Sequence, residues 1–348
     1  MTTDLRDVLH DRLDAVVAPV GDLDGVRASG RRLRRRRRIV AGGGVVLASV
    51  LVIGALGYAG SGDDRPTDRG LEPVGPMDFD QGLRAYADPG HEIHLGGRTF
   101  PSTRLDYLDT DAAATPYGVV FYAGGRPRLL QETGKVADLE PDAEGTDFHP
   151  TAKVDAQGPL VAYGVTIDGQ AEVVVRDLDS DEVVARHDVS RDTVIDALDG
   201  GTVFLRTDAG TTTWDTVTGQ VDPFAGPKTR VADVRNGVVL YDGPEPADPD
   251  TLPFFLVKGA IDAQLTYDGS HVLSWSNRLE PTDGGRPIVL DVKATFYAVD
   301  TDGSILAAGF ARGGGAVVHD CEVPSGECTE LGPLTTKGGD PMFIGVDM

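Results

Sequence analysis

A short motif recurs six times between residues 117 and 307: a pair of residues that includes glycine, followed by a run of apolar residues. Glycine adopts the positive φ angles of tight turns, and short apolar runs between turns are typical of strands. Measured between the centres of the apolar runs, the copies follow one another at intervals of 33 to 43 residues, so each interval holds one small strand-rich unit. The six turn pairs are Tyr117-Gly118, Gln157-Gly158, Gly200-Gly201, Asn236-Gly237, Asp268-Gly269 and Asp302-Gly303.

This period predicts the blades of a β-propeller, because a single blade cannot bury both of its faces and must stack on its neighbours around a channel. Beyond residue 78 no convincing helical periodicity interrupts the short apolar runs. The sequence therefore predicts an all-β, six- or seven-bladed propeller over residues 79–348, with a pair of β-sandwiches as the alternative. A seventh blade would combine residues 343–346 with strands such as Glu92–Leu95, and this closure would remove exposed sheet edges.

A second motif falls later in several of the units, where a strand enters a turn that begins with aspartate. Its fullest copy is Trp214-Asp215 followed by Thr218-Gly219-Gln220, and residues 177–181 and 319–327 are degraded copies. Here the chain resembles the WD-repeat and quinoprotein-like propellers, at the level of the superfamily. The quinoprotein repeat ends in Trp, and Phe224 stands near that place. One partial copy implies no bound quinone, so no cofactor is predicted.

Residues 39–60 form an uncharged, largely apolar run. As a helix this run would extend about 33 Å, enough to cross the hydrocarbon core of a bilayer. Arginines precede the run directly, and arginine beside a span holds that flank in the cytoplasm. The sequence therefore predicts a single-pass membrane protein with a cytoplasmic N-terminus and an extracytoplasmic C-terminal domain. The membrane-flanking residues are Arg31, Arg32, Arg34, Arg35, Arg36, Arg37 and Arg38.

Two other interpretations of this segment remain open. A cleaved signal peptide would use Gly57-Tyr58-Ala59 as its small-residue site, although such peptides have a shorter leader and a shorter apolar region. Arg31-Arg32 before the apolar run also fits a twin-arginine export signal. A buried soluble helix is disfavoured, because the adjoining arginines could not enter a core. Residues 61–78 are rich in Gly, Pro and Asp and predict a flexible linker.

Residues 1–38 predict an Arg-rich cytoplasmic tail that contains one amphipathic helix. The helix would span residues 4–18, with Asp4 as a cap and Pro19 as a stop. It is too short to be stable alone, so it lies on the membrane, stays unstructured or enters a groove on a cytoplasmic partner. The tail resembles the leaders of actinobacterial membrane proteins, some of which are anti-sigma factors, but it lacks their Cys/His zinc motif. Its apolar face comprises Leu5, Val8, Leu9, Leu13, Val16 and Val17.

The charge of the chain argues against nucleic acid as a partner. The formal net charge is −23, and the part beyond residue 38 holds 49 Asp and Glu against 22 Lys and Arg. Affinity for nucleic acid depends on neutralising phosphates, which this acidic part would instead repel. Asp177, Asp179 and Asp181 alternate like calcium ligands, but Glu182 and Asp188 stand where a calcium loop needs Gly and Glu. A solvated turn is predicted there, and no metal site.

The two cysteines, Cys321 and Cys328, flank the turn Pro324-Ser325-Gly326. This arrangement predicts a hairpin with its two thiols facing each other, and outside the cytoplasm they would form a disulfide. A metal site with His319 as a third ligand is the alternative.

The sequence contains no Gly-x-Ser-x-Gly elbow, His-Glu-x-x-His, phosphate-binding loop or Gly-x-Gly-x-x-Gly motif. A repeat domain without a recognisable catalytic set, joined to an anchor, predicts a non-catalytic propeller that binds an extracellular protein or glycan and signals inward through its tail. The first alternative is an exported hydrolase or lyase that uses the propeller channel. The second is an anti-sigma-like transmembrane regulator that acts through residues 1–38. Fold alone does not decide among them.

Overall fold

A computed structural model describes the fold of residues 82–87, 92–101, 112–131, 133–145, 148, 151–156, 158–246, 249, 252–260, 262–274, 276–310, 316–334 and 342–344. The predicted tail, apolar segment and linker all lie outside these residues. Within the described ranges, no helix has the length and apolar character needed to cross a membrane.

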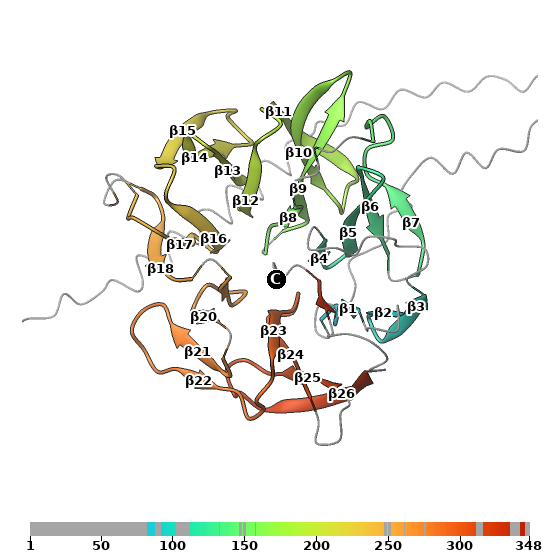
Figure 1. The fold of residues 1–348 in the computed structure, drawn as a ribbon, viewed down its shortest axis with the longest axis vertical. Helices are drawn as coiled ribbons and strands as arrows, with labels where there is room; N and C mark the ends of the chain where they lie inside the picture. Colours follow the sequence, from blue (N-terminus) through green and yellow to red (C-terminus); the bar gives the residue numbers. More distant parts are fainter. Residues whose placement is uncertain are drawn as a thin grey trace, which may run out of the picture. The chain divides into compact units, whose positions relative to one another are not determined.

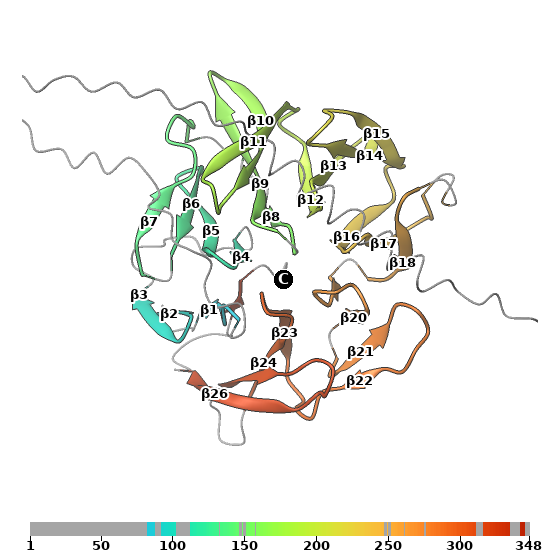
Figure 2. The same cartoon turned by 180° about the vertical axis from the view of Figure 1, so that it is seen from behind.

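Seven sheets surround a common axis, so the domain is a seven-bladed propeller (Figure 1; Figure 2 shows it from behind). Blades 2 to 4 have four antiparallel strands each. Blade 2 comprises β4 (Ala113–Thr115), β5 (Gly118–Ala123), β6 (Arg126–Leu130) and β7 (Val136–Asp138). Blade 3 comprises β8 (Lys153–Val154), β9 (Leu160–Ile167), β10 (Gln170–Asp177) and β11 (Glu182–Asp188). Blade 4 comprises β12 (Val194–Asp199), β13 (Thr202–Thr207), β14 (Gly210–Asp215) and β15 (Val221–Ala225).

Blades 5 to 7 complete the run along the chain. Blade 5 comprises β16 (Arg230–Arg235), β17 (Val238–Asp242) and β18 (Phe255–Lys258). Blade 6 comprises β19 (Gln264–Leu265), β20 (His271–Leu273), β21 (Arg278–Pro281) and β22 (Ile288–Val289). Blade 7 comprises β23 (Phe296–Val299), β24 (Ile305–Phe310), β25 (Ala316–Cys321) and β26 (Cys328–Leu334).

Blade 1 joins the two ends of the domain. Its strand order is β27 (Met342–Phe343), β1 (Tyr86–Ala87), β2 (Glu92–Leu95) and β3 (Arg98–Pro101). The late strand β27 pairs antiparallel with β1, so that Tyr86 lies opposite Phe343. The predicted partnership of residues near 343 with Glu92–Leu95 is therefore confirmed, and the ring has seven blades. The β-sandwich alternative is wrong.

The six recurring turn pairs occupy one place in the fold. In blades 2 to 7 the glycine that ends each pair lies at the turn between the innermost strand and the second strand, called the inner turn below. Gly118 has a φ of 135°, and a Cβ placed on it would collide with the carbonyl oxygen of Leu130. The chain can pass between two strands there only because glycine lacks a side chain.

The apolar core is divided among the spaces between neighbouring blades. Seven clusters of buried side chains occur, and each joins residues of two adjacent blades. Between blades 3 and 4, for example, Val173 and Val175 pack with Leu205 and Trp214. Because each strand alternates its side chains between the two faces, one blade contributes to two clusters. Each blade therefore buries its apolar side chains against both of its neighbours.

Blade 5 departs from the repeat because its outermost strand, β18, runs parallel to β17. The connection between these strands contains Pro244, Pro246, Pro249 and Pro253. Proline has no N–H for a strand ladder, and the described residues of this connection contain no strand. The blade is left with three strands. The regular intervals of the sequence motif did not predict this departure.

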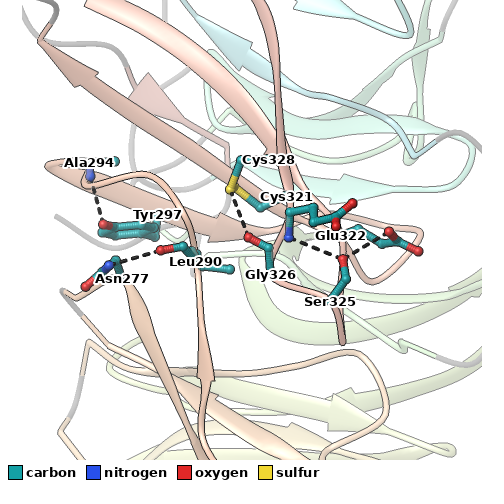
Figure 3. The surroundings of a disulfide bond; sticks show 10 residues. Asn277, Leu290, Ala294, Tyr297, Cys321, Glu322, Ser325, Gly326 and Cys328 are labelled. Carbon is teal, nitrogen blue, oxygen red and sulfur yellow. Dashed lines mark hydrogen bonds between the residues drawn. A yellow bond between two sulfur atoms is a disulfide. The ribbon is translucent and has the colours of Figure 1, made fainter.

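Cys321 and Cys328 form the predicted disulfide (Figure 3). They lie opposite each other on β25 and β26, at the end of the hairpin. The turn between them packs on blade 6, where the backbone N–H of Asp291 donates to the carbonyl oxygen of Gly326 at 3.0 Å. Ser325 donates its hydroxyl to Glu322 at 3.0 Å, as Figure 3 shows. Both sulfur atoms are in the S–S bond, so the alternative metal site is wrong.

Candidate functional site

The innermost strands surround a central cavity of about 100 Å³. Its lining is polar on one side and apolar on the other. The polar side chains come from blades 3 to 6, whereas the lining from blades 7, 1 and 2 is apolar. The polar residues are Thr151, Lys153, Asp196, Asp233, Arg235, Asp262 and Gln264, and the apolar residues of blades 7, 1 and 2 are Ala113, Ala114, Val299 and Ile344.

Asp196, on the inner strand of blade 4, is held by an arginine of the next strand. Both carboxylate oxygens accept from Nε of Arg206 at 3.0 Å. Burial raises the pKa of Asp196, and the positive charges of Arg206 and Lys153 and a bond from the Val231 backbone oppose that rise. The carboxylate thus connects the inner strand of blade 4 to the inner strand of blade 5.

The next two blades repeat this connection. Asp233 of blade 5 accepts the backbone N–H of Leu265 in blade 6 at 2.9 Å, and Nε of Arg235 lies 3.2 Å from the same carboxylate. Gln264 of blade 6 then accepts the backbone N–H of Val299 in blade 7 at 3.0 Å. These polar lining residues therefore bond one inner strand to the next around the channel.

A second series of carboxylates joins the inner turns. Asp155 at the end of β8 accepts the backbone N–H of Gly200 in blade 4 at 3.2 Å. Asp199 at the end of β12 accepts the backbone N–H groups of Asn236 and Gly237 in blade 5 at 3.0 and 2.9 Å. In both cases a carboxylate at the end of one inner strand caps the inner turn of the following blade.

Asp300 makes the same kind of contact between the last blade and the first. It accepts the backbone N–H groups of Leu83 at 3.2 Å and Arg84 at 2.8 Å, which stand where an inner turn of blade 1 would lie. Burial raises the pKa of Asp300 to about 6; bonds from the backbone of Thr301 and Arg84 oppose the rise, and the charges of Asp302 and Asp320 add to it. Arg84 also pairs with Asp320 at 2.8 Å.

These bonds limit the chemistry of the channel. Each aspartate in its described lining has an interaction partner. A cavity of about 100 Å³ is also smaller than the roughly 300–1,000 Å³ of most small-molecule sites. The observations therefore favour a structural role for the channel carboxylates, and they give no support to a carbohydrate hydrolase or lyase that works there.

The Asp-containing turns predicted from the sequence have one geometry in blades 3 and 4. Asp177 accepts the backbone N–H groups of Asp179 and Ser180 at 2.8 and 3.0 Å, and Asp215 does the same for Val217 and Thr218 at 2.9 and 2.8 Å. These are Asx turns between the third and fourth strands. In the part of the chain that the structure describes, no group of three His, Cys, Asp or Glu residues could hold a metal.

The outer rim carries a feature that the sequence motifs did not predict. The large apolar side chains exposed in the described residues lie on the outermost strands, or the turns beside them, of four consecutive blades, 3 to 6. Val217 is 87% exposed and Phe255 is 55% exposed. We call these residues the apolar rim: Val184, Val217, Val221, Phe255 and Val289. The proline cluster before Phe255 was the signal in the sequence that this sector departs from the repeat.

Of the predicted site residues, only the two cysteines lie among the described residues. The disulfide is in place, whereas the tail helix of residues 5–17 and the arginines of residues 31–38 lie outside the described residues.

No protein-family model and no curated protein matches the chain. Among solved structures, TolB from Acinetobacter baumannii is similar at 14% identity and a TM-score of 0.36, with 78% of this chain and 68% of that chain covered. Hsv2p from Kluyveromyces lactis is similar at 14% identity and a TM-score of 0.36, over 62% and 72% of the chains. The calcium-binding protein regucalcin from Agrobacterium tumefaciens is similar at 14% identity and a TM-score of 0.28, with 53% of this chain and 73% of that chain covered. These are proteins of the propeller type, and likenesses of this strength carry no argument about function.

Proposed function

We propose that the chain is a membrane-anchored, extracytoplasmic propeller that binds another exported protein through its apolar rim. The observation that carries the proposal is the concentration of exposed apolar side chains on blades 3 to 6. Single exposed apolar residues are common on soluble proteins, but a group confined to one sector is typical of an interaction surface. Of the two predicted partner classes, protein is favoured over glycan, because valine and phenylalanine side chains gain most from apolar contact.

In this proposal the predicted anchor and tail define the membrane topology of the protein. An apolar segment at residues 39–60, preceded by arginines, would hold the propeller outside the cytoplasm and the tail inside it. The predicted helix of residues 4–18 would then be available to a cytoplasmic partner, so that binding at the rim could be reported inward.

Crosslinking of the full-length protein in its native membrane, followed by affinity purification and mass spectrometry, tests the proposal. The rim variant combines Val217→Asp with Val289→Asp. The control combines Thr99→Asp with Thr329→Asp, which adds the same charge at exposed positions on the outer strands of blades 1 and 7. An exported protein captured by the wild type and the control, but not by the rim variant, is expected. Equal capture by all three would contradict binding at the rim.

A version that lacks residues 1–30 tests the tail in the same experiment. We expect a cytoplasmic protein to be captured by the full-length chain and lost with this truncation. If only envelope proteins are captured, equally with both versions, the tail serves topology alone.

A further inference from the structure

We propose that the free edge of β18 binds an extended segment of the partner protein, which pairs with it as the fourth strand of blade 5. This inference rests on the proposed function and assigns its central contact. It starts from the strand count among the described residues, where blade 5 has three strands and each of the other six sheets has four. Neighbouring strands lie about 4.8 Å apart, so the missing strand leaves room for one extended chain beside β18.

The backbone of β18 provides the bonds for such a strand. Phe255 and Gly259 donate their N–H groups inward, to Gly237 and Tyr241 of the β17 region, both at 2.9 Å. Residues of a strand alternate in the direction of their backbone groups, so the N–H and C=O of Leu256 and Lys258 point away from β17. No residue in the described ranges bonds these outward groups.

The side chains of β18 hold the strand in place while its edge stays open. Leu256 packs into the cluster between blades 4 and 5, and Val257 packs into the cluster between blades 5 and 6. Beside them Phe255 is 55% exposed. A strand anchored on both faces needs little further ordering when a peptide pairs with its edge.

The other long outer strands carry features that discourage pairing. β15 contains Pro223, β26 contains Pro333, and β11 carries Glu182, Arg186 and Asp188. Proline and charge at an edge are common means of blocking unwanted strand addition. In β18 the apolar run Phe255-Leu256-Val257 comes before Lys258 and contains neither proline nor charge.

The negative charge of the exported part indicates which kind of segment would bind at β18. With 49 acidic residues against 22 basic ones beyond residue 38, this part repels a second copy of itself and attracts a basic chain. Cross-strand neighbours of Phe255 and Val257 would be apolar or β-branched. The occupant is therefore an extended segment of an exported protein in which Lys or Arg alternates with β-branched residues.

The main test compares Lys258→Pro with Lys258→Ala in the purified full-length protein. Both variants remove the charge of an exposed side chain, but only proline removes the outward N–H of residue 258. The probe is the nine-residue peptide Lys-Val-Thr-Val-Lys-Val-Thr-Val-Lys, and its acidic counterpart carries Glu in place of Lys. We expect Lys258→Ala to bind the basic peptide within about twofold of wild type, and Lys258→Pro to bind it about tenfold or more weakly.

A second measurement leaves the protein unchanged. The basic peptide with alternate backbone nitrogens methylated cannot form a complete ladder, and it should lose binding to the wild type. Equal binding of the methylated peptide, or equal binding by the two Lys258 variants, would overturn strand addition. Equal binding of the acidic peptide would overturn the choice of occupant.

A photoreactive residue in place of Phe255 identifies the native occupant in the membrane. A crosslinked exported protein, lost in Lys258→Pro but kept in Lys258→Ala, supports the proposal. A product made of two copies of this chain would overturn it. If the rim variant loses the partner and Lys258→Pro keeps it, the inference fails and the proposed function stands; if neither variant affects capture, the proposed function fails.

Discussion

The contact of Asp300 with the backbone of Leu83 and Arg84 joins the last blade to the first, and it makes the stability of the ring depend on pH. The Asp300 side chain is almost completely buried and accepts two backbone N–H groups across the closure. Burial raises its pKa to about 6, above the ordinary value of 3.8. The replacement Asp300→Asn keeps the shape of the side chain and removes the titration.

The sign of the effect follows from linkage. Because the pKa is higher in the folded state than in the unfolded state, the folded state binds the proton more tightly, and Asp300 contributes more stability as the pH falls. A shift of this size corresponds to about 3 kcal/mol once the pH is below both values. Between pH 7 and pH 5 the contribution rises by about 1 kcal/mol.

Urea unfolding of the purified full-length protein at pH 7, 6 and 5 measures this difference. The free energy of unfolding of the wild type, relative to Asp300→Asn, should rise by about 1 kcal/mol as the pH falls from 7 to 5. The other titrating groups cancel in the comparison, so the slope is informative even though Asn also alters one of the two hydrogen bonds. A difference that stays constant over this range, or that falls, would refute the assignment.

Three further substitutions test the contacts between and within blades by urea unfolding. Cys321→Ser with Cys328→Ser should lower the free energy of unfolding by at most about 2.5 kcal/mol, because the disulfide closes a short loop, and reduced wild type should match the variant. Trp214→Ala should cost about 3–5 kcal/mol, because this side chain is 2% exposed between blades 3 and 4. Tyr122→Phe should cost about 1–3 kcal/mol, because its hydroxyl donates to the carbonyl of Gly164 and accepts the N–H of the same residue; a cost near zero would contradict that role.

Much of the fold was predictable because each repeat contains a tight turn that requires particular residues. Five of the six inner turns hold a glycine with a positive φ angle, which other residues rarely adopt: Gly118, Gly201, Gly237, Gly269 and Gly303. The pairing of the two chain ends followed from the need to remove sheet edges, and Tyr86 opposite Phe343 confirms it. The disulfide was predictable because both cysteines flank one turn.

The roles of the acidic residues were not predictable in the same way. Asp155 and Asp199 cap turns that lie 37 to 45 residues away along the chain, and Asp300 bonds to residues at the other end of the domain. Nothing in the sequence near an aspartate indicates which distant N–H it will accept. The sequence did not distinguish these residues from the many other acidic side chains, and only the arrangement of the blades assigns them to the bonds between blades.

The departure in blade 5 shows why a repeat in sequence does not guarantee a repeat in structure. The turn motifs of blades 5 and 6 are regularly spaced, but spacing records only the length of chain between turns and not how that length pairs. Four prolines in the connection remove the donors that the third strand would need. The same segment also has to bury Phe254, whose ring centre lies 5.3 Å from that of Phe204 in blade 4. One contact therefore draws the connection toward blade 4 while β18 keeps its place beside β17. The result is an outer strand that pairs with β17 along one edge and bonds no described residue along the other, in the sector of the rim where the exposed apolar side chains lie.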